Sequence, residues 1–211
     1  MIIDKTTLNS FKSRYRAILI NSLAGVKQAI LIGTKSKDLH SNLAIFNSLI
    51  HIGAKPPLWG FIFRPDTVKR DTLENILETN EYTLNYVALN DFEKAHQTSA
   101  KYDTAVSEFE ACGFSEMYHT DFFAPFVAEA PIKVAMNLEQ KIDIHINNTI
   151  LIIGSIDHIE IDENMISADG FVDLAQATTL ACAGLDAYYK TTLIERLHYA
   201  RPDQPIKNLL Y

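Results

Sequence analysis

The stretch IKVAMNLEQKIDIHINNTILII, residues 132–153, decides the fold class. Every second position is apolar in two consecutive runs, Ile132, Val134, Met136 and Leu138, then Ile142, Ile144 and Ile146. A period of two is typical of a β-strand that buries one face. The pair Asn147-Asn148 then marks a turn into another apolar run, Thr149–Ile153. The stretch therefore predicts antiparallel strands joined by a hairpin.

Further strands are predicted on the N-terminal side of this hairpin. Ala29–Gly33 and Leu58–Phe63 are short apolar runs bounded by turn residues, and Tyr82–Val87 alternates between apolar and polar side chains. Strands and helices do not alternate regularly along the chain. The pattern therefore favours a mainly β fold with a closed antiparallel sheet over a doubly wound parallel one.

Few helices are expected, and they should lie at the periphery. Asp71 and Glu74 form a possible capping box, and the apolar residues after them share one helix face. Leu174–Tyr189 is predicted as a second helix, from the spacing of its larger side chains. A third turn or short helix is expected around Val106–Cys112.

The composition limits the classes of protein to which this chain can belong. With 211 residues, 47% of them hydrophobic, the chain can form one sizeable domain, and no linker or repeat divides residues 1–211. The formal charge of −7 disfavours broad binding to nucleic acid. No signal peptide or membrane-spanning run is evident, so we expect a soluble, cytoplasmic protein. Cys112 and Cys182 are isolated, which predicts buried thiols and no disulfide.

The segment DLHSNLAIFNSLIHIGAKPPLWGFIFRPDTVKRDTLE, residues 38–74, holds the candidate site. A loop of small polar and apolar residues is expected at 41–48, followed by a Pro-Pro strand entry. Arg64, Lys69 and Arg70 then precede the capped helix start. Short polar groups, an apolar wall and local positive charge at a helix N-terminus suit a phosphorylated ligand with a flat ring.

Other chemistries lack their motifs. The seven histidines show no HxH, HExxH or Cys/His spacing, so no metal centre is expected. GxSxG, GxGxxG and GxxxxGK[ST] are absent, which leaves a hydrolase elbow, a Rossmann fingerprint and a P-loop without support. A triad assembled from distant residues stays open, although no spacing recommends one.

The segment resembles the FMN-contacting region of the flavin reductase-like family, in which an Asn-Leu-Ala-Pro-Phe-Ser type loop precedes Pro-Pro and a basic residue before Asp-Thr. The resemblance extends through residues 20–34, 71–87, 96–114, 130–140 and 151–163. Residues 96–114 are similar to the family's Thr-Ser-Ala and Glu-Phe-Glu insert. Ile45 and Asn47 depart from the family, which has Pro and Ser at these positions.

The resemblance implies an FMN-binding split β-barrel with a few peripheral helices. It implies a flavin reductase, or NAD(P)H:FMN oxidoreductase, in which main-chain N–H groups of the 42–48 loop bind the ring's polar edge. Phosphate would be held by Arg64, Arg70, Ser48, Thr72 and the helix start. His96, Ser99 and Ala100 would lie beside the flavin, for binding and not for catalysis. No catalytic side chain is assigned, and the candidate FMN-binding residues are Ser41, Asn42, Leu43, Ala44, Ile45, Phe46, Asn47, Ser48, Arg64, Arg70, Asp71, Thr72, His96, Ser99 and Ala100.

Alternatives stay open at this point. The same barrel could be a non-catalytic FMN-binding electron carrier or a pyridoxamine-phosphate-oxidase-like enzyme. Phe46 could be core, and the arginines could be solvent-facing.

The resemblance also implies a homodimer with its flavin sites at or near the interface. Aromatic residues at 102, 118, 122, 123 and 126 are candidates for that interface, or for a loop folded over its own barrel.

Overall fold

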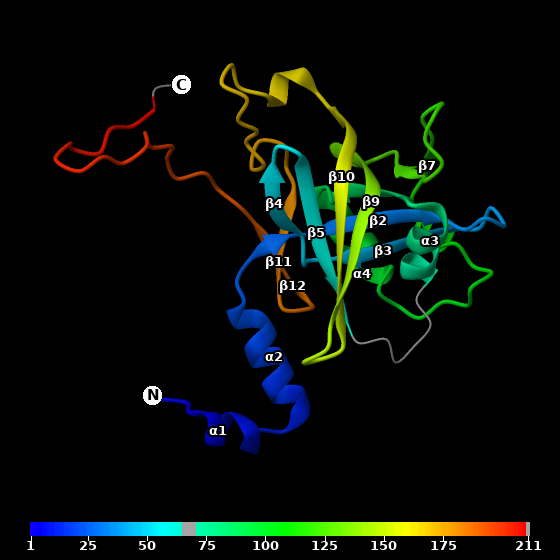
Figure 1. The fold of residues 1–211 in the computed structure, drawn as a ribbon, viewed down its shortest axis with the longest axis horizontal. Helices are drawn as coiled ribbons and strands as arrows, with labels where there is room; N and C mark the ends of the chain where they lie inside the picture. The colour runs from blue at the N-terminus through cyan, green and yellow to red at the C-terminus, as the bar shows by residue number, and fades with distance from the viewer. Residues whose placement is uncertain (65–70, 210–211) are drawn as a thin grey trace.

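The main body of the protein is one antiparallel sheet of seven strands (Figure 1). The computed structural model describes residues 1–64 and 71–209. The strand order is β3-β2-β6-β9-β10-β5-β4, and every neighbouring pair is antiparallel. The strands are β2 (Ile30–Lys35), β3 (Ser41–Phe46), β4 (Ile50–Ala54), β5 (Pro57–Phe63), β6 (Glu81–Tyr86), β9 (Ile132–Ile144) and β10 (Thr149–Ile161). The mainly β prediction is confirmed.

The sheet curls because a short link joins its two edge strands. β3 and β4 lie at opposite edges, yet β3 ends at Phe46 and β4 begins at Ile50. Four Cα steps of about 3.8 Å bring these residues within about 15 Å of each other. The sheet therefore forms a barrel that stays split between β3 and β4.

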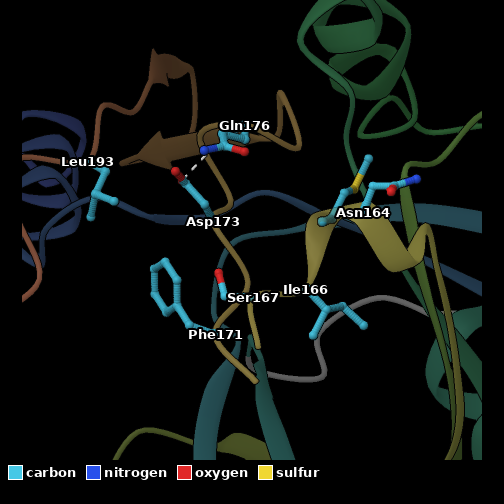
Figure 2. A pocket seen from close by; sticks show the side chains of 8 residues that line it. Asn164, Ile166, Ser167, Phe171, Asp173, Gln176 and Leu193 are labelled. Atoms are coloured by element: carbon cyan, nitrogen blue, oxygen red, sulfur yellow. Dashed lines mark hydrogen bonds between the residues drawn. The ribbon is translucent and has the colours of Figure 1, made fainter. Parts of the chain in front are cut away.

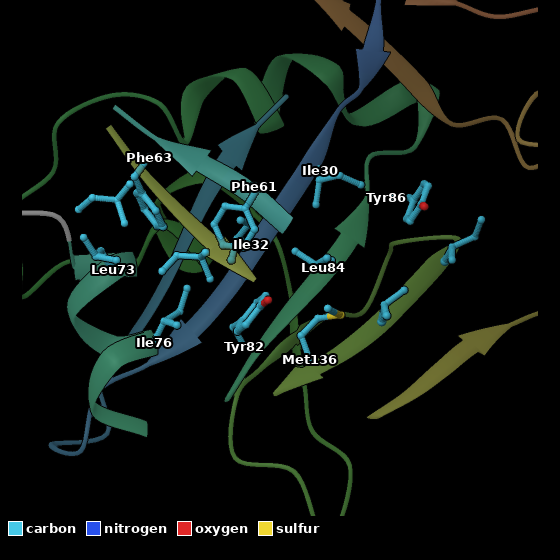
Figure 3. Packing of buried hydrophobic residues seen from close by; sticks show 14 of the residues in the cluster. Ile30, Ile32, Phe61, Phe63, Leu73, Ile76, Tyr82, Leu84, Tyr86 and Met136 are labelled. Atoms are coloured by element: carbon cyan, nitrogen blue, oxygen red, sulfur yellow. The ribbon is translucent and has the colours of Figure 1, made fainter. Parts of the chain in front are cut away.

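Large apolar side chains fill the barrel (Figure 3). Phe61, Phe63, Tyr82, Leu84 and Met136 are almost entirely buried and belong to one cluster. Burying a side chain of this size stabilises the fold by about 1.5–3 kcal/mol. Helix α3 (Asp71–Thr79) places Leu73 and Ile76 against the same cluster.

A second cluster covers the outer side of β2 and β3. It joins Leu31 and Leu43 to Ala95 of α4 (Phe92–Gln97), Phe109 of α5 (Glu108–Cys112) and Leu180 of β11 (Leu180–Ala183). β11 is the central strand of a small sheet with β1 (Lys27–Gln28) and β12 (Ala187–Lys190). The remaining elements are α1 (Lys5–Ser10), α2 (Ser13–Leu23), η1 (Leu89–Asp91), β7 (Glu116–Met117), β8 (Phe126–Val127) and η2 (Glu163–Met165).

The predicted hairpin and two of the three predicted helices are present. β9 and β10 pair across the Asn147-Asn148 turn, α3 begins at Asp71, and α5 ends at Cys112. Cys112 and Cys182 are buried free thiols, as predicted.

The predicted helix over Leu174–Tyr189 is wrong. This stretch contains the β11–β12 hairpin, in which Leu180 pairs with Lys190 and Gly184 turns the chain at a φ of 65°. Such a φ favours glycine and is outside the right-handed helical region. The run Leu180–Ala183 is entirely buried, and a short buried strand cannot be told from a buried helix by periodicity alone.

The expected loop at 41–48 is a loop only in its last residues, because Ser41–Phe46 forms the edge strand β3. The N-terminal helices α1 and α2 were not predicted at all. Among the described residues, no helix is both long and apolar enough to cross a membrane.

Candidate functional site

The candidate site is built along β3, the edge strand on one side of the barrel split. Leu43 and Ile45 pack against the outer cluster, whereas Phe46 packs into the barrel against Phe61 and Phe63. The alternation of a strand explains this division, since successive side chains point to opposite faces. Phe46 therefore packs against the core and stays partly exposed.

Glu108 at the start of α5 closes part of the outer edge of β3. Its carboxylate accepts a hydrogen bond of 3.0 Å from the Leu43 N–H. Burial raises the pKa of Glu108, although this backbone hydrogen bond opposes the shift. Because N–H groups of an antiparallel edge strand point outward at every second residue, Ile45 presents its N–H on the same side as Leu43. This leaves Ile45 as a main-chain donor suited to the polar edge of a ring.

Side chains in the link between β3 and β4 form hydrogen bonds to neighbouring elements and so fix the link at the barrel split. The Ser48 hydroxyl accepts from the Ile62 N–H at 3.0 Å and donates to the Ile62 carbonyl at 3.1 Å, so it substitutes for a backbone ladder partner. The Asn47 amide donates to the Gly184 carbonyl and so ties the link to the β11–β12 turn. These two side chains are therefore engaged within the chain.

The start of α3 is fixed directly to β3. The Asn42 amide donates to the Thr72 hydroxyl at 2.9 Å, and both residues are buried. One turn later, the Asn75 amide donates to the Thr34 hydroxyl of β2 at 3.1 Å. The N-terminus of α3, with its positive dipole end, is therefore held beside β3.

Of the basic residues predicted to lie near the phosphate, Arg64 is within the described part of the chain. Arg64 is exposed and directly follows β5. Arg70 and Lys69 lie outside the described residues. Asp71 opens α3.

His96, Ser99 and Ala100 come together at the end of α4, on the outer side of the barrel. The Ser99 N–H donates to the His96 carbonyl at 3.0 Å, and the Ala100 N–H donates to the Gln97 carbonyl at the same distance. The His96 Nδ1 lies 2.9 Å from the Tyr188 hydroxyl of β12. All three residues are exposed, whereas burial raises the pKa of Tyr188 to about 12. The predicted residues thus fall in two groups, one at the α3 start and one at the end of α4.

The pocket beside Asn42 does not suit a phosphate. It has a volume of about 160 Å³ and is lined by Ser36, Asp38, His40, Ser41, Asn42, Asp71, Glu74, Asn75, Glu78, Thr104, Val106 and Glu108. Sites for drug-sized ligands usually exceed 300 Å³. Five carboxylates in so small a space would repel an anion. The phosphate would therefore have to lie nearer the segment between Arg64 and Thr72.

A second pocket, of about 330 Å³, lies elsewhere (Figure 2). It is lined by Asn164, Met165, Ile166, Ser167, Phe171, Asp173, Gln176 and Leu193, none of which was predicted to bind flavin. The Asp173 carboxylate accepts from the Ala175 N–H at 2.9 Å and the Gln176 N–H at 3.4 Å, so it caps its own loop. No cationic side chain lines this pocket in the part of the chain that the structure describes.

The main-chain donors suit the ring of a flavin, whereas the basic residues expected to hold its phosphate lie only in part within the described residues. The outward edge of β3 and the main chain of the link that follows it offer donors beside partly buried apolar side chains. Arg64 is the basic residue of the predicted site that lies within the described residues. Glu108 and Tyr188 contact predicted residues, Leu43 and His96, but are absent from the predicted set. Glu108 belongs to the quoted Glu-Phe-Glu insert, whereas Tyr188 falls in the stretch wrongly predicted as a helix.

Comparison with solved structures identifies close likeness over nearly the whole chain. A candidate flavin reductase with a split barrel domain from Shewanella frigidimarina NCIMB 400 is 46% identical, with a TM-score of 0.91, and the match covers 95% of this chain and 100% of that one. This likeness supports the split barrel derived above from the β3–β4 link.

More distant structures share the fold. An FMN-binding protein from Thermus thermophilus is 15% identical, with a TM-score of 0.68 over 82% of this chain and 92% of that one. The NADH:FAD oxidoreductase SgcE6 of Streptomyces globisporus is 10% identical, with a TM-score of 0.67 over 92% and 98%. At these identities the likeness shows the fold alone.

The family model described as "Flavin reductase like domain" matches residues 24–178, which include β3, the barrel split, α3 and α4. The match covers well over half of the chain and most of the residues predicted to form the site. The chain therefore belongs to the flavin reductase-like domain family.

Proposed function

We propose that the protein is an FMN-binding oxidoreductase that passes a hydride from NAD(P)H to FMN. The observation that carries the proposal is the Asn42–Thr72 hydrogen bond, which holds the family's ring-contacting strand against the helix start proposed to face phosphate. A bound flavin would supply the redox chemistry, and the protein would supply binding, orientation and electrostatics.

In this proposal the chain's own residues bind and do not transfer protons. The ring's polar edge is held by the main chain from Asn42 to Ser48, with Ile45 and the link residues as the donors that the ladder leaves outward. Arg64, Arg70 and the main chain at Asp71 and Thr72 hold the phosphate through charge-assisted hydrogen bonds. His96, Ser99 and Ala100 at the end of α4 border the ring.

FMN is proposed over FAD from the sequence between β5 and α3. Arg64, Lys69 and Arg70 lie within seven residues and immediately before a helix start, an arrangement suited to a terminal phosphate. The relatives of known structure carry names with either flavin, so the choice rests on this chain's own residues.

We further propose a cytoplasmic homodimer with one domain per chain. The two free thiols fit a reducing compartment. Of the aromatic residues considered for the interface, Phe122 and Phe126 are buried in their own chain, which favours the folded-loop alternative for these two. Tyr102, Tyr118 and Phe123 are partly or largely exposed and stay candidates for a partner that completes the site.

Flavin titration tests the proposal. Purified protein is titrated with FMN, FAD and riboflavin, and NAD(P)H oxidation is then followed at known FMN occupancy. We expect FMN to bind more tightly than riboflavin and turnover to rise with occupancy. Equal affinity for FMN and riboflavin would remove the phosphate site. Tight FMN binding without NAD(P)H oxidation would instead identify an electron carrier.

A further inference from the structure

The β11–β12 hairpin contacts both groups of predicted site residues. Cys182 of β11 and Tyr188 of β12 are directly paired across the hairpin, so their side chains share one face of it. The Cys182 thiol lies 3.7 Å from the Asn47 amide nitrogen in the β3–β4 link. The Tyr188 hydroxyl lies 2.9 Å from His96 Nδ1 at the end of α4. One hairpin therefore connects the residues predicted from 41–48 with those predicted at 96–100.

The Tyr188 ring is held by several contacts. It packs against the outer cluster, against which Ile45 of β3 also packs. The centroid of the Phe92 ring lies 6.0 Å from that of Tyr188. The centroid of the His96 ring lies 5.8 Å away, with an interplanar angle of 89°. These contacts fix the tyrosine ring, so its hydroxyl is held at His96 Nδ1.

The proton in the hydrogen bond between these two side chains belongs to the tyrosine. Burial raises the pKa of Tyr188 to about 12, so its hydroxyl stays protonated at neutral pH. Within residues 1–64 and 71–209, His96 Nδ1 is the one acceptor that this hydroxyl reaches. An N–H at Nδ1 would therefore leave the hydroxyl proton without an acceptor in that part of the chain. Because neutral imidazole carries one N–H and one acceptor nitrogen, a hydroxyl that donates to Nδ1 places the imidazole proton on Nε2.

His96 Nε2 is the nitrogen that remains for a ligand. It has no hydrogen-bond partner among the described residues, and His96 is exposed, as are Ser99 and Ala100. An N–H at Nε2 can donate to a carbonyl oxygen, whereas an unprotonated nitrogen can only accept. The tautomer of His96 therefore decides whether the end of α4 offers a ligand a donor or an acceptor.

We infer that Tyr188 is a positioning residue that holds neutral His96 with its proton on Nε2, so that His96 donates a hydrogen bond to a carbonyl oxygen of the flavin ring. The identity of the acceptor rests on the proposed function, whereas the tautomer rests on contacts within the chain. FMN and riboflavin share the same ring. The hydrogen bond should therefore contribute equally to the affinity of both flavins.

NMR of full-length protein with isotope-labelled histidine tests the tautomer without flavin. Spectra are recorded at alkaline pH, where imidazole is neutral, and the His96 signals are assigned by their loss in His96→Gln. We expect wild type to hold the proton on Nε2. Tyr188→Phe should give the tautomer mixture that the exposed His145 gives in the same spectrum. A wild-type proton on Nδ1, or an unchanged tautomer in Tyr188→Phe, overturns the inference.

Tyr189→Phe is the matched control. Tyr189 is the next residue on β12 and is 46% exposed, and successive side chains of a strand point to opposite faces. The control therefore removes the same hydroxyl group on the side of the strand away from His96. Its spectrum should match that of wild type.

Flavin titration gives the second readout. Tyr188→Phe should weaken FMN and riboflavin alike by about threefold to tenfold, the effect of one hydrogen bond, and Tyr189→Phe should weaken neither. In the His96→Gln background, Tyr188→Phe should have no further effect, because the glutamine amide donor has no tautomer to fix.

The titrations separate positioning from packing. Unchanged flavin affinity in Tyr188→Phe overturns the inference. An equal loss with and without His96→Gln also overturns it, because Tyr188 would then act by packing alone. Wild type that binds neither flavin overturns the ring acceptor together with the proposed function, while the spectra separately decide whether Tyr188 sets the tautomer of His96.

Discussion

At the residue scale, the Ser48 side chain fixes the β3–β4 link to β5 at the barrel split. Its hydroxyl both accepts from and donates to the main chain of Ile62, at the point where the β4–β5 ladder has no further backbone partner. Conversion to alanine leaves a partly buried N–H and C=O without a partner, which costs about 1–3 kcal/mol.

We therefore expect Ser48→Ala to lower the free energy of unfolding by about 1–3 kcal/mol in denaturant titrations. The control is Ser99→Ala, which removes an exposed hydroxyl at the end of α4 and should leave stability nearly unchanged. Equal stability of the two variants would show that the hydroxyl contributes nothing to the split.

The hypothesis that this chain binds the phosphate of FMN can be tested at Arg70. Arg70→Ala should weaken FMN binding by about 1.5–3 kcal/mol, the range for a hydrogen bond to a charged group, and should leave riboflavin binding nearly unchanged. Lys5→Ala removes the same charge at an exposed position of α1, outside the predicted site, and is the control. An equal loss for both flavins in isothermal titration would place Arg70 away from the phosphate.

Glu108 should make stability depend on pH. Burial raises its pKa in the folded state, so the folded protein holds this proton to higher pH than the unfolded chain does. Its contribution to stability is fully present below the ordinary carboxyl pKa and is lost as pH rises through the raised value.

Glu108→Gln keeps an acceptor for the Leu43 N–H and removes the titration. We expect the variant to lose less stability than wild type as pH rises across that window, measured as midpoints of chemical unfolding. Glu110→Gln alters an exposed neighbour on the same helix and should follow wild type. Parallel pH profiles for wild type and Glu108→Gln would contradict the assigned burial.

At the element scale, the coupling of β3 to α3 rests on the Asn42–Thr72 hydrogen bond. A double-mutant cycle with Asn42→Ala and Thr72→Ala should give a coupling free energy of about 0.5–1.5 kcal/mol. Asn147 and Thr149 form a matched but exposed pair at the β9–β10 turn, for which a smaller coupling is expected. Additive effects at the buried pair would show that the two elements are held by other contacts.

Elements with a strong local signal were predictable from the sequence. The alternation in β9, the turn at Asn147-Asn148 and the start of α3 at Asp71 each depend on neighbouring residues, and all three are present. The β11–β12 hairpin was missed because its strands are short, uniformly buried and stabilised by pairing with β1, which is distant in sequence. Ser48 as a ladder substitute and Tyr188 beside His96 likewise depend on contacts that only the folded chain creates.

At the scale of the whole molecule, the curled sheet brings the predicted residues to the barrel split. Residues predicted from one stretch, 41–48, divide between the barrel core and the outer cluster, and α3 and α4 then supply separate groups on either side of β3. This arrangement suits the proposed site, in which a flavin is held through main chain and charge and no side chain is assigned to proton transfer.

Flavin occupancy should therefore control activity. At full FMN occupancy, His96→Ala and Ser99→Ala should change NAD(P)H oxidation only modestly, because the proposed function gives these residues a place beside the ring and no proton to move. Steady-state rates normalised to bound FMN measure this effect. A loss of several orders of magnitude at full occupancy would require a protein acid or base.

The most direct test of the central claim is anaerobic mixing of FMN-loaded protein with NADH or NADPH, followed by absorbance. We predict that the visible band of bound FMN is lost with one of the two nicotinamides, at a rate that saturates with its concentration. Protein that fails to bind FMN, or bound FMN whose band persists with both nicotinamides, would contradict the account.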